Sequence, residues 1–541
     1  MKSSFTRSLL VYAALIIGGV VFAWPFFWMA STSVKLEQEI FGGDNRGWPQ
    51  MPRPPVRSPY IDERAFADVS GPRAEETLKL IAQQLPAESQ GAIARAVYTK
   101  LLTTFPAETW KLPEGEFEAA IERAVTEELI TSAVTQLRRV FSVGRLRARS
   151  FAAREDQLVA PETAASAWKL GGDARASLVP AFANDEQFAE LHYDFASGGT
   201  VSLSQTFTTT FPAAELHRLQ LYARNDDSWH ALRITAEKNG TVYRAERAVD
   251  LADRDWAIHT WQFRSPEDRP NKIKTWTWLQ EVDRGAQYLA SPNEIKVTIE
   301  LQRRSTAGAW LAKMLRNYRL TLDYIPFWRY VATSVFLLII NVIATVFSCS
   351  LVAYAFARLQ WPGREVCFAL LLATMMVPVQ VVMIPQFLIM QKLGWYNTLK
   401  PLWIASLFAP AFYVFLLRQF LKGVPRDLED AARLDGCGFL RIYWHIMLPL
   451  IRPALAAIAI FTFLATWNEF MGPLIYLADQ RLYPLSFGLY AFQVQALQPG
   501  TTAGIGMLMA GALLMTLPVI AIFFFAQRYF LQGVTLTGIK G

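Results

Sequence analysis

The chain has 541 residues, of which 52% are hydrophobic and only 18% charged, and its net charge is +7. Charged residues usually make up about a quarter of a soluble protein, so a very apolar portion must accompany a polar one. No dense basic run or aromatic RNA-binding motif supports nucleic-acid binding. All three cysteines, Cys349, Cys367 and Cys437, lie in the C-terminal apolar region, which excludes a disulfide framework in the polar stretch before it.

The N-terminal segment predicts a first membrane helix, which we assign to residues 1–41. Residues 9–30 form an apolar run without charge, long enough to cross a hydrocarbon core of about 30 Å. Lys2 and Arg7 precede this run, so the N-terminus is expected on the cytoplasmic side. A cleavable signal peptide has the same layout and is the alternative. The length of the run and the five apolar spans far downstream favour a membrane helix.

Residues 42–324 form a long polar insert that begins with a linker rich in Pro, Gly and Arg at residues 42–60. From about residue 70 to residue 150 a helical period dominates. Its clearest part is one apolar stripe on a solvated helix, and this stripe continues toward residue 141: Phe117, Ile121, Val125, Leu129, Ala133, Leu137, Val140 and Phe141.

A period of two replaces the helical period from about residue 185 to residue 324. Residues 201–207, 219–222 and 295–301 largely alternate apolar and polar side chains, as half-buried strands do. Asn239-Gly240 lies between two such runs and predicts a tight hairpin turn. Several short strands with turn signals favour a β-sandwich, so the insert is predicted to be an α+β domain.

After residue 324 the chain is membrane-like to its end, with five apolar spans of 20 to 27 residues at about 331–357, 367–390, 402–421, 454–477 and 505–525. Together with the first helix they predict six transmembrane helices, which return the C-terminus to the cytoplasm. Lys and Arg agree with this orientation, because they gather in the predicted inner loops. The insert is then expected on the outer side of the cytoplasmic membrane, in the periplasm of a Gram-negative cell.

Between the fourth and fifth spans, residues 425–453 predict a polar helix–turn–helix at the inner membrane face. Residues 429–434 form a short amphipathic helix whose first turn is acidic, as the helix dipole favours. Ala431 and Ala432 are expected to give a flat surface that another protein can approach closely. Gly436 is expected to break the helix, and a second helical stretch covers residues 439–447. Such an element is suited to docking.

This segment resembles the EAA loop of ABC importer permeases, with Asp430 in place of the usual Glu and with Glu429 beside it. Further stretches, from residues 25–35, 353–358, 361–364, 467–470, 527–530 and 533–541, are similar to the second membrane subunit of maltose-type carbohydrate importers. The resemblance covers about residues 8–41 and 325–541, but not the insert. The positions that it assigns to the coupling loop are Glu429, Asp430, Ala431, Ala432, Gly436, Ile446, Leu448 and Pro449.

The resemblance implies a type I ABC importer permease, with six transmembrane helices, that translocates a sugar or oligosaccharide by alternating access. A second permease subunit, a pair of ATPase subunits and an extracytoplasmic solute-binding protein would complete the assembly. The chain contains no phosphate-binding Gly-Lys-Ser/Thr loop, so ATP and magnesium are expected on the partner ATPases and no cofactor on this chain. The chain itself is therefore expected to be a transport subunit and not an enzyme.

Two further groups are candidate sites. Trp467, Asn468 and Glu469 lie near the outer end of the fifth span, where an ionisable group could line the path or a gate. The alternative is that Glu469 is hydrated or caps a helix. In the outer loop, the aromatic residues Tyr483, Tyr490 and Phe492 could contact the binding protein, or could anchor helix ends at the membrane interface.

The function of the insert stays open at this point. Its aromatic residues, among them Trp229, Trp256, Trp261, Trp276 and Trp278, could stack on sugars or could pack a core. Its histidines lack metal-ligand spacing, and no metal site is expected. By analogy with another importer subunit, we expect the insert to help dock the solute-binding protein. The alternative functions are a membrane-anchored glycan-binding or glycan-cleaving protein, and a permease-derived sensor.

Overall fold

The computed structural model describes residues 2–41, 47–61, 71–85, 90–150, 157–158, 167–183, 186–264, 276–284, 292–496 and 504–535. The chain forms two compact units. The apolar unit contains Met1–Gln50 and Met314–Gly541, and the β-rich unit contains Met51–Asp268 and Thr275–Lys313. Residues 536–541 of the expected C-terminal tail lie outside the described residues, as do residues 497–503 of the expected outer loop.

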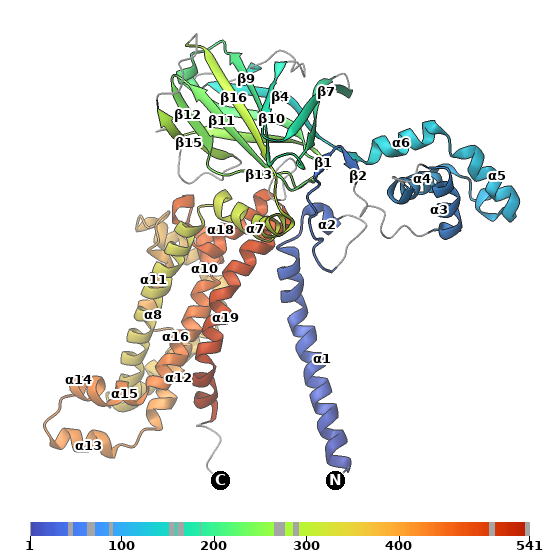
Figure 1. Ribbon diagram of the computed structural model, residues 1–541. Helices are drawn as coiled ribbons and strands as arrows, with labels where there is room; N and C mark the ends of the chain where they lie inside the picture. The colour runs from blue at the N-terminus through green and yellow to red at the C-terminus, as the bar shows by residue number, and fades with distance from the viewer. Residues whose placement is uncertain are drawn as a thin grey trace. The chain divides into compact units, whose positions relative to one another are not determined.

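The apolar unit is helical. Its longer helices are α1 (Lys2–Thr32), α8 (Phe327–Arg358), α9 (Arg364–Thr374), α10 (Val379–Lys392), α12 (Ala411–Lys422), α16 (Arg452–Trp467), α18 (Leu485–Ala496) and α19 (Ile505–Thr535). Figure 1 shows α8, α16 and α19 running side by side through the unit, with α13 and α14 at one end and α18 at the other. This arrangement follows from their composition, because each helix carries an apolar surface along most of its length.

Among the described residues, four helices are long and apolar enough to cross a membrane: Val11–Thr32, Phe327–Arg358, Pro401–Lys422 and Ile505–Phe525. Two further pairs qualify only as bent helices: Arg364–Thr374 with Val379–Lys392, bent by 98°, and Phe439–Leu450 with Arg452–Trp467, bent by 77°. The single span expected at residues 367–390 is therefore broken, because Pro378 disfavours helical backbone at the residue before it. The span expected at 454–477 ends at Trp467, and a short helix α17 (Met471–Tyr476) follows.

The β-rich unit begins with a small helical cluster of α3 (Ala74–Gln83), α4 (Gln90–Thr104), α5 (Glu114–Ala124) and α6 (Glu127–Leu137). The expected apolar stripe is buried there, since Phe117, Ile121, Val125 and Ala133 share one core. The stripe does not follow one helix, however. α5 ends at Ala124, and the backbone of the next residue, Val125, leaves the helical region at ψ 75°. α6 is a new helix, and the Thr126 hydroxyl accepts the N–H of Leu129 at its start.

A large sheet makes up the rest of the unit. Its main strands are β4 (Phe141–Ser150), β7 (Arg175–Ala183), β8 (Glu186–Asp194), β9 (Thr200–Thr208), β10 (Leu216–Arg224), β11 (Ala231–Lys238), β12 (Thr241–Ala245), β14 (Trp256–Phe263), β15 (Thr277–Arg284) and β16 (Glu294–Gln302). The path of hydrogen-bonded strands runs β1-β8-β4-β10-β14-β15-β12-β11-β16-β9-β6, where β1 is Arg57–Ser58 and β6 is Lys169–Gly172.

One core lies between the two halves of this path. Leu146 of β4 and Leu221 of β10 pack in the same cluster as Ile234 of β11 and Val297 of β16, so the sheet curls over itself (Figure 1). The expected two-sheet sandwich is instead one continuous hydrogen-bonded sheet, because β14 and β15 pair in parallel and join the two halves.

The expected hairpin is present. β11 and β12 pair in antiparallel fashion up to Lys238 and Thr241, and Asn239 and Gly240 both have positive φ, 50° and 70°. These are the angles that a two-residue turn of the favoured handedness needs.

The β region predicted for residues 185–324 has the wrong limits at both ends. Strand β4 begins at Phe141, where a continuing helix was expected, because Leu146 and Ala148 alternate into the core with a period of two. Residues 306–324 are helix α7 (Thr306–Tyr324), not strand. Its side chains form a helical face: Asn317 donates to the carbonyls of Ser33 and Lys35, both at 2.9 Å, and the Thr321 hydroxyl donates to the Met507 carbonyl at 2.9 Å.

His230 is a fully buried polar residue of the β-rich unit. The backbone N–H of Arg304 donates to its Nδ1 at 3.2 Å, so Nε2 carries the proton and donates to the Pro55 carbonyl at 2.9 Å. The imidazole thus joins the segment that leads into the unit to the segment that leads out of it. Burial, together with Arg303 and Arg304, lowers the pKa of His230 from 6.5 to about 4.

This shift predicts an acid limb in the stability of the unit. Between pH 6.5 and 4 the unfolded histidine takes up a proton that the folded one does not, so the free energy of unfolding falls, by up to about 3 kcal/mol. Asp226 acts in the opposite direction, because burial raises its pKa to about 6. We therefore expect the difference in free energy between the wild-type protein and His230→Gln to shrink on acidification, measured by hydrogen exchange in β11.

Asp226→Asn serves as the control for that measurement. Asp226→Asn removes the proton that the folded protein takes up at Asp226. In this variant, which retains His230, the free energy of unfolding should therefore fall more steeply on acidification than in the wild-type protein. Parallel curves for the wild-type protein and His230→Gln from pH 7 to 4.5 would contradict the assignment of a neutral buried imidazole.

Candidate functional site

The segment 425–453 folds as α13 (Asp427–Leu434), a tight turn, α14 (Phe439–Ile442), a π-helical turn at Tyr443–Met447 and α15 (Leu448–Leu450). Helix α13 has two different faces. Glu429 and Ala432 face inward and are 4% and 6% exposed. Asp430 and Ala431 face outward, next to Leu434, which is 90% exposed. The expected flat surface of two alanines is therefore wrong in part, since the inward position of Ala432 leaves Ala431 alone on the outer face.

A buried arginine holds the inner face of α13 in place. Arg358, the last residue of α8, has its Nε 3.1 Å from Oε1 of Glu429, and both side chains are at most 5% exposed. The geometry is that of an ion pair and not of a well-aligned hydrogen bond. Its Nη2 donates to the carbonyls of Leu421 and Val424, the latter at 2.6 Å. The Leu421 carbonyl lies in the last turn of α12, where the helix dipole favours a cation, and Val424 follows two residues after the helix.

Arg358 therefore connects the ends of three helices, α8, α12 and α13. In the sequence, Arg358 is one of the expected inner-loop charges and the last residue of the stretch 353–358 that carries the family resemblance. Its pairing with Glu429 was not predicted, because Glu429 lies 71 positions further along the chain. Arg358 and Arg433 both approach Glu429, but only Arg358 is buried. Arg433 also approaches Glu429, at 3.8 Å, but its side chain is 45% exposed.

Gly436 ends α13, as expected, and its role lies in the backbone. It has φ 80°, and a Cβ atom at this position would meet nothing within 4 Å. The N–H of Gly436 donates to the Arg433 carbonyl at 3.0 Å, and the N–H of Cys437 donates to the Ala432 carbonyl at 2.9 Å. This pair of bonds is the Schellman motif, which uses a left-handed residue directly after the helix.

The second helical stretch packs onto the helix bundle. The hydroxyls of Tyr443 and Ser350 are 2.8 Å apart, and the hydroxyl of Tyr354 donates to the Phe439 carbonyl at 3.3 Å. Ile446 and Leu448 are partly buried against the core that contains Ile442. Pro449 lies next to them, in a mostly apolar cavity between α8 and α16. These residues therefore fix the segment on α8 instead of facing outward.

Trp467, Asn468 and Glu469 lie where α16 ends. Trp467 is buried and donates through Nε1 to the Met515 carbonyl at 3.0 Å, and Asn468 donates to the Leu464 carbonyl at 2.9 Å. Oε1 of Glu469 accepts the N–H of Gly472 at 2.8 Å, in the first turn of α17. The structure thus gives each of the three a local partner, and for Glu469 this is the capping role that was the alternative interpretation.

The three outer-loop aromatics lie in different environments. Phe492 is fully buried, and its ring centroid is 5.3 Å from that of Tyr324. The prediction that Phe492 contacts a partner protein is therefore wrong for this conformation. Tyr483 is partly buried, 4.4 Å from Phe487. Tyr490 is 40% exposed and remains accessible to a partner.

Two acidic residues of the β-rich unit, Asp250 and Asp253, have separate partners. Asp250 pairs with Arg304 at 2.7 Å, and Asp253 accepts from the amide of Asn225. Across the residues that the structure describes, no three His, Cys, Asp or Glu side chains gather in a way that could hold a metal ion. Trp229 and Trp261 are buried, as core packing requires, whereas Trp256, Trp276 and Trp278 are only partly buried.

Comparison with known proteins identifies relatives of the apolar unit. Residues 348–536 match the family described as binding-protein-dependent transport system inner membrane component. The arabinooligosaccharides transport system permease protein AraQ of Halalkalibacterium halodurans is 38% identical over 216 residues, which are 40% of this chain and 75% of that protein. The lactose transport system permease protein LacG of Rhizobium radiobacter is 32% identical over 234 residues, 43% of this chain and 82% of that protein.

A solved structure, described as a bacterial ABC transporter involved in the import of the acidic polysaccharide alginate, has 27% sequence identity and a TM-score of 0.36. The alignment covers 40% of this chain and 79% of that chain.

Removal of the Arg358 guanidinium should destabilise the apolar unit strongly. In Arg358→Met, Glu429 is left as a buried charge without its main partner, which costs about 3–5 kcal/mol. In the double variant Arg358→Met/Glu429→Gln that charge is gone, so we expect recovery of at least half of the loss. The readout is the free energy of unfolding of the solubilised protein in a double-mutant cycle.

Arg433→Met is the matched control, because it removes the second and largely exposed arginine from the same carboxylate. It should change stability by about 0–1 kcal/mol. Equal losses for Arg358→Met and Arg433→Met would show that the buried pair has no special role.

Gly436→Ala should cost about 1–2 kcal/mol, because an L-residue is disfavoured at φ 80°. Gly438 offers a close control: it lies two residues away, and a Cβ atom there would also meet nothing within 4 Å, but no positive φ is found. Hydrogen exchange at the α13 amides should therefore accelerate in Gly436→Ala and stay near wild type in Gly438→Ala. The assignment fails if the two variants behave alike.

Proposed function

The chain belongs to the family of binding-protein-dependent transport system inner membrane components and is a permease subunit of an ABC importer, and from this premise we propose that it translocates a sugar or oligosaccharide by alternating access. The identity to a permease for arabinooligosaccharides, over three quarters of that protein's length, supports the substrate class. The lactose permease points to the same class. In such a mechanism a cavity in the membrane opens to one side and then to the other.

The observation that carries the proposal is the outer face of α13. Leu434 is 90% exposed and Leu428 is 43% exposed, and Asp427 and Asp430 of the same helix are exposed as well. Apolar side chains on a short polar helix are costly to leave in water, which is typical of a surface that another protein covers. We propose that this face, with Ala431, docks in a cleft of the partner ATPase.

The inner face would then transmit the movement. Glu429 and Ala432 are packed against the helix bundle, and Arg358 fastens Glu429 to α8 and α12. A push on α13 therefore reaches two helices through a buried ion pair and backbone hydrogen bonds. Gly436 sets the angle between α13 and the second helical stretch.

The proposed assembly contains a second permease subunit, a pair of ATPase subunits that bind ATP and magnesium, and an extracytoplasmic solute-binding protein. Its membrane part has six spans in this chain if each bent helix pair counts as one. Both termini would face the cytoplasm, with residues 42–324 on the outer side of the inner membrane. The gathering of Lys422, Arg426, Arg433 and Arg441 around α13 supports this orientation.

For the β-rich unit we propose a position next to the solute-binding protein, as part of its docking surface. In the apolar unit, Tyr490, the one exposed aromatic among the three candidates of the expected outer loop, is proposed as a contact of its own for the binding protein. A membrane-anchored glycan-binding or glycan-cleaving protein is the weaker proposal, because an anchor has no use for an exposed apolar face on α13. No observation favours a sensor.

Two substitutions on the outer face of α13 test the proposal, one that reverses a charge and one that places a charge on the apolar surface. In the reconstituted assembly, Asp430→Lys and Leu434→Glu should reduce the ATP hydrolysis that the binding protein stimulates by about tenfold or more, as loss of 1.4 kcal/mol at an interface does. Arabinooligosaccharides and lactose serve as candidate solutes, and the one that stimulates hydrolysis defines the substrate.

Glu114→Lys, an equal charge reversal at the start of α5, is the control and should leave stimulation within about twofold of wild type. Unchanged hydrolysis in both α13 variants, with the ATPase subunits still bound, would refute the proposed coupling surface.

A further inference from the structure

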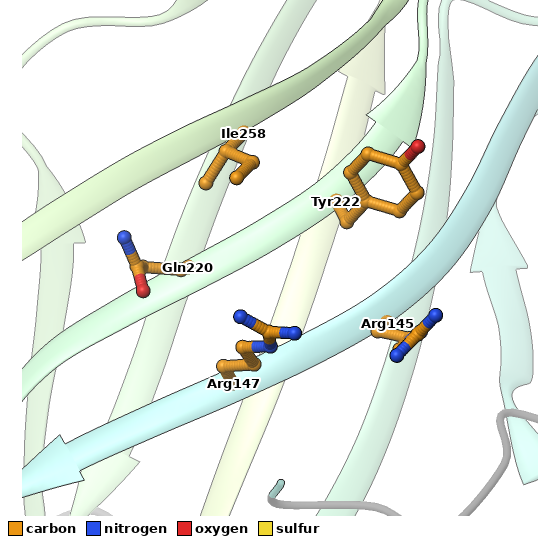
Figure 2. A pocket seen from close by; sticks show the side chains of 5 residues that line it. All are labelled: Arg145, Arg147, Gln220, Tyr222 and Ile258. Carbon is orange, nitrogen blue, oxygen red and sulfur yellow. The ribbon is translucent and has the colours of Figure 1, made fainter. Parts of the chain in front are cut away.

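A pocket in the β-rich unit lies on the outer face of three neighbouring strands. Its lining consists of Arg145 and Arg147 from β4, Gln220 and Tyr222 from β10, and Ile258 from β14, around a volume of about 150 Å³. Figure 2 shows the two guanidinium groups on one strand, Gln220 and Tyr222 on the next and Ile258 on the third. This volume is below the range of about 300–1,000 Å³ for drug-sized ligands, so the pocket suits one ring or the end of a longer chain.

Strand register brings these side chains together. Gln220 pairs with Arg147 on one side and with Thr260 on the other, and Tyr222 pairs with Ile258. Because Leu146 and Ala148 point into the core, Arg145 and Arg147 point to the opposite face. The amide of Gln220 donates to the Thr260 hydroxyl at 3.4 Å, which orients it within the row.

A β-bulge shapes one side of the pocket. Leu221 lies opposite Leu146, and Ala223 lies opposite Val143, so two residues of β4, Gly144 and Arg145, face the single residue Tyr222. Bulges of this kind change the direction of a side chain and are common beside binding sites. Gly144 is needed there, because a Cβ atom would lie 2.8 Å from the Tyr222 carbonyl oxygen and 3.1 Å from the Trp256 ring.

The space that Gly144 leaves is filled by stacked aromatics. The rings of Tyr222 and Trp256 are stacked, with centroids 4.7 Å apart and planes 18° apart, and Phe188 meets Trp256 edge-on at 5.3 Å. This packing holds Tyr222 rigidly at the pocket wall. Ile258, 56% exposed, adds an apolar surface on the other side.

We propose that this pocket binds a saccharide that carries a carboxylate, such as a uronic acid residue. A guanidinium presents parallel N–H donors that match a carboxylate, and two of them line this pocket. None of the five lining side chains, all within the described residues, is acidic. The amide of Gln220 suits hydroxyl groups, and Tyr222 and Ile258 suit the apolar C–H faces of a sugar ring.

A free oxyanion explains the pocket less well. Phosphate would use the two arginines, but it would leave the rigid aromatic stack and Ile258 without a role. The choice of a saccharide rests on the proposed function, since the chain is proposed to serve sugar uptake. The pocket residues belong to the β-rich unit, whereas α13 belongs to the apolar unit.

Binding is tested on the purified full chain in lipid nanodiscs by titration calorimetry. The probes are tetragalacturonate, a neutral galactose tetrasaccharide and inorganic phosphate. We expect tetragalacturonate to bind more tightly than the other two probes, with an affinity that falls as salt rises. Arg145→Gln and Arg147→Gln should each weaken it at least tenfold. Arg149→Gln is the matched control on the same strand, outside the pocket lining, and should stay within twofold.

The comparison among the three probes on the wild-type protein needs no variant, so it holds even if an arginine variant folds poorly. Equal binding of the neutral tetrasaccharide, equal binding of phosphate, or undiminished uronate binding in both Arg145→Gln and Arg147→Gln would each overturn the proposal. A second measurement distinguishes failure of the uronate site from failure of the proposed transport function. It is the ATP hydrolysis stimulated by a neutral solute, in the reconstituted assembly that carries the same arginine variants. Hydrolysis should remain normal when only the uronate site is lost.

Discussion

The guanidinium of Arg358 is the constraint around which the end of the apolar unit that carries α13 is arranged. A buried charge is tolerated only with a counter-charge and hydrogen-bond acceptors in place. Here one carboxylate supplies the counter-charge, and two carbonyls, one in the last turn of α12 and one just after it, supply the acceptors, so the ends of three helices must meet at one point. Any movement of α13 relative to α8 would expose or break this set of contacts. The segment is therefore expected to move together with the helices that it meets.

This constraint explains why α13 divides its acidic residues between two tasks. Glu429 neutralises Arg358 inside, whereas Asp430, one residue later, points to the outside. Adjacent positions on a helix differ by about 100° in direction, so two neighbouring acids cannot share a face. The aspartate where relatives are expected to carry glutamate is thus the exposed acid, and the shorter arm leaves the buried pair untouched.

Local pattern predicted those parts of the fold that depend on nearby residues. The alternation along residues 295–301 and the Asn239-Gly240 turn follow from backbone preferences of a few residues, and both are present in the structure. The break between α5 and α6 at Val125 was not predicted, because the apolar spacing continues unchanged across it. The Arg358–Glu429 pair joins residues that are far apart in sequence, and the Arg145 pocket depends on the register of three strands and on a bulge at Gly144. Neither register nor such a distant pairing can be read from one strand or helix alone.

His230 has a consequence for how such a chain could arise. Its two ring nitrogens contact the segment that leads into the β-rich unit at Pro55 and the segment that leads out at Arg304. The two segments by which the chain enters and leaves the unit are therefore separated by a single imidazole ring at Pro55 and Arg304. A folded unit whose chain ends are adjacent connects the flanking segments over a short distance, as a short loop does. Its presence therefore adds little to the entropic cost of closing that loop. A gene segment that encodes a unit with adjacent chain ends can be inserted into a loop of another protein at little cost in stability, which makes such units exchangeable modules in evolution and in protein engineering.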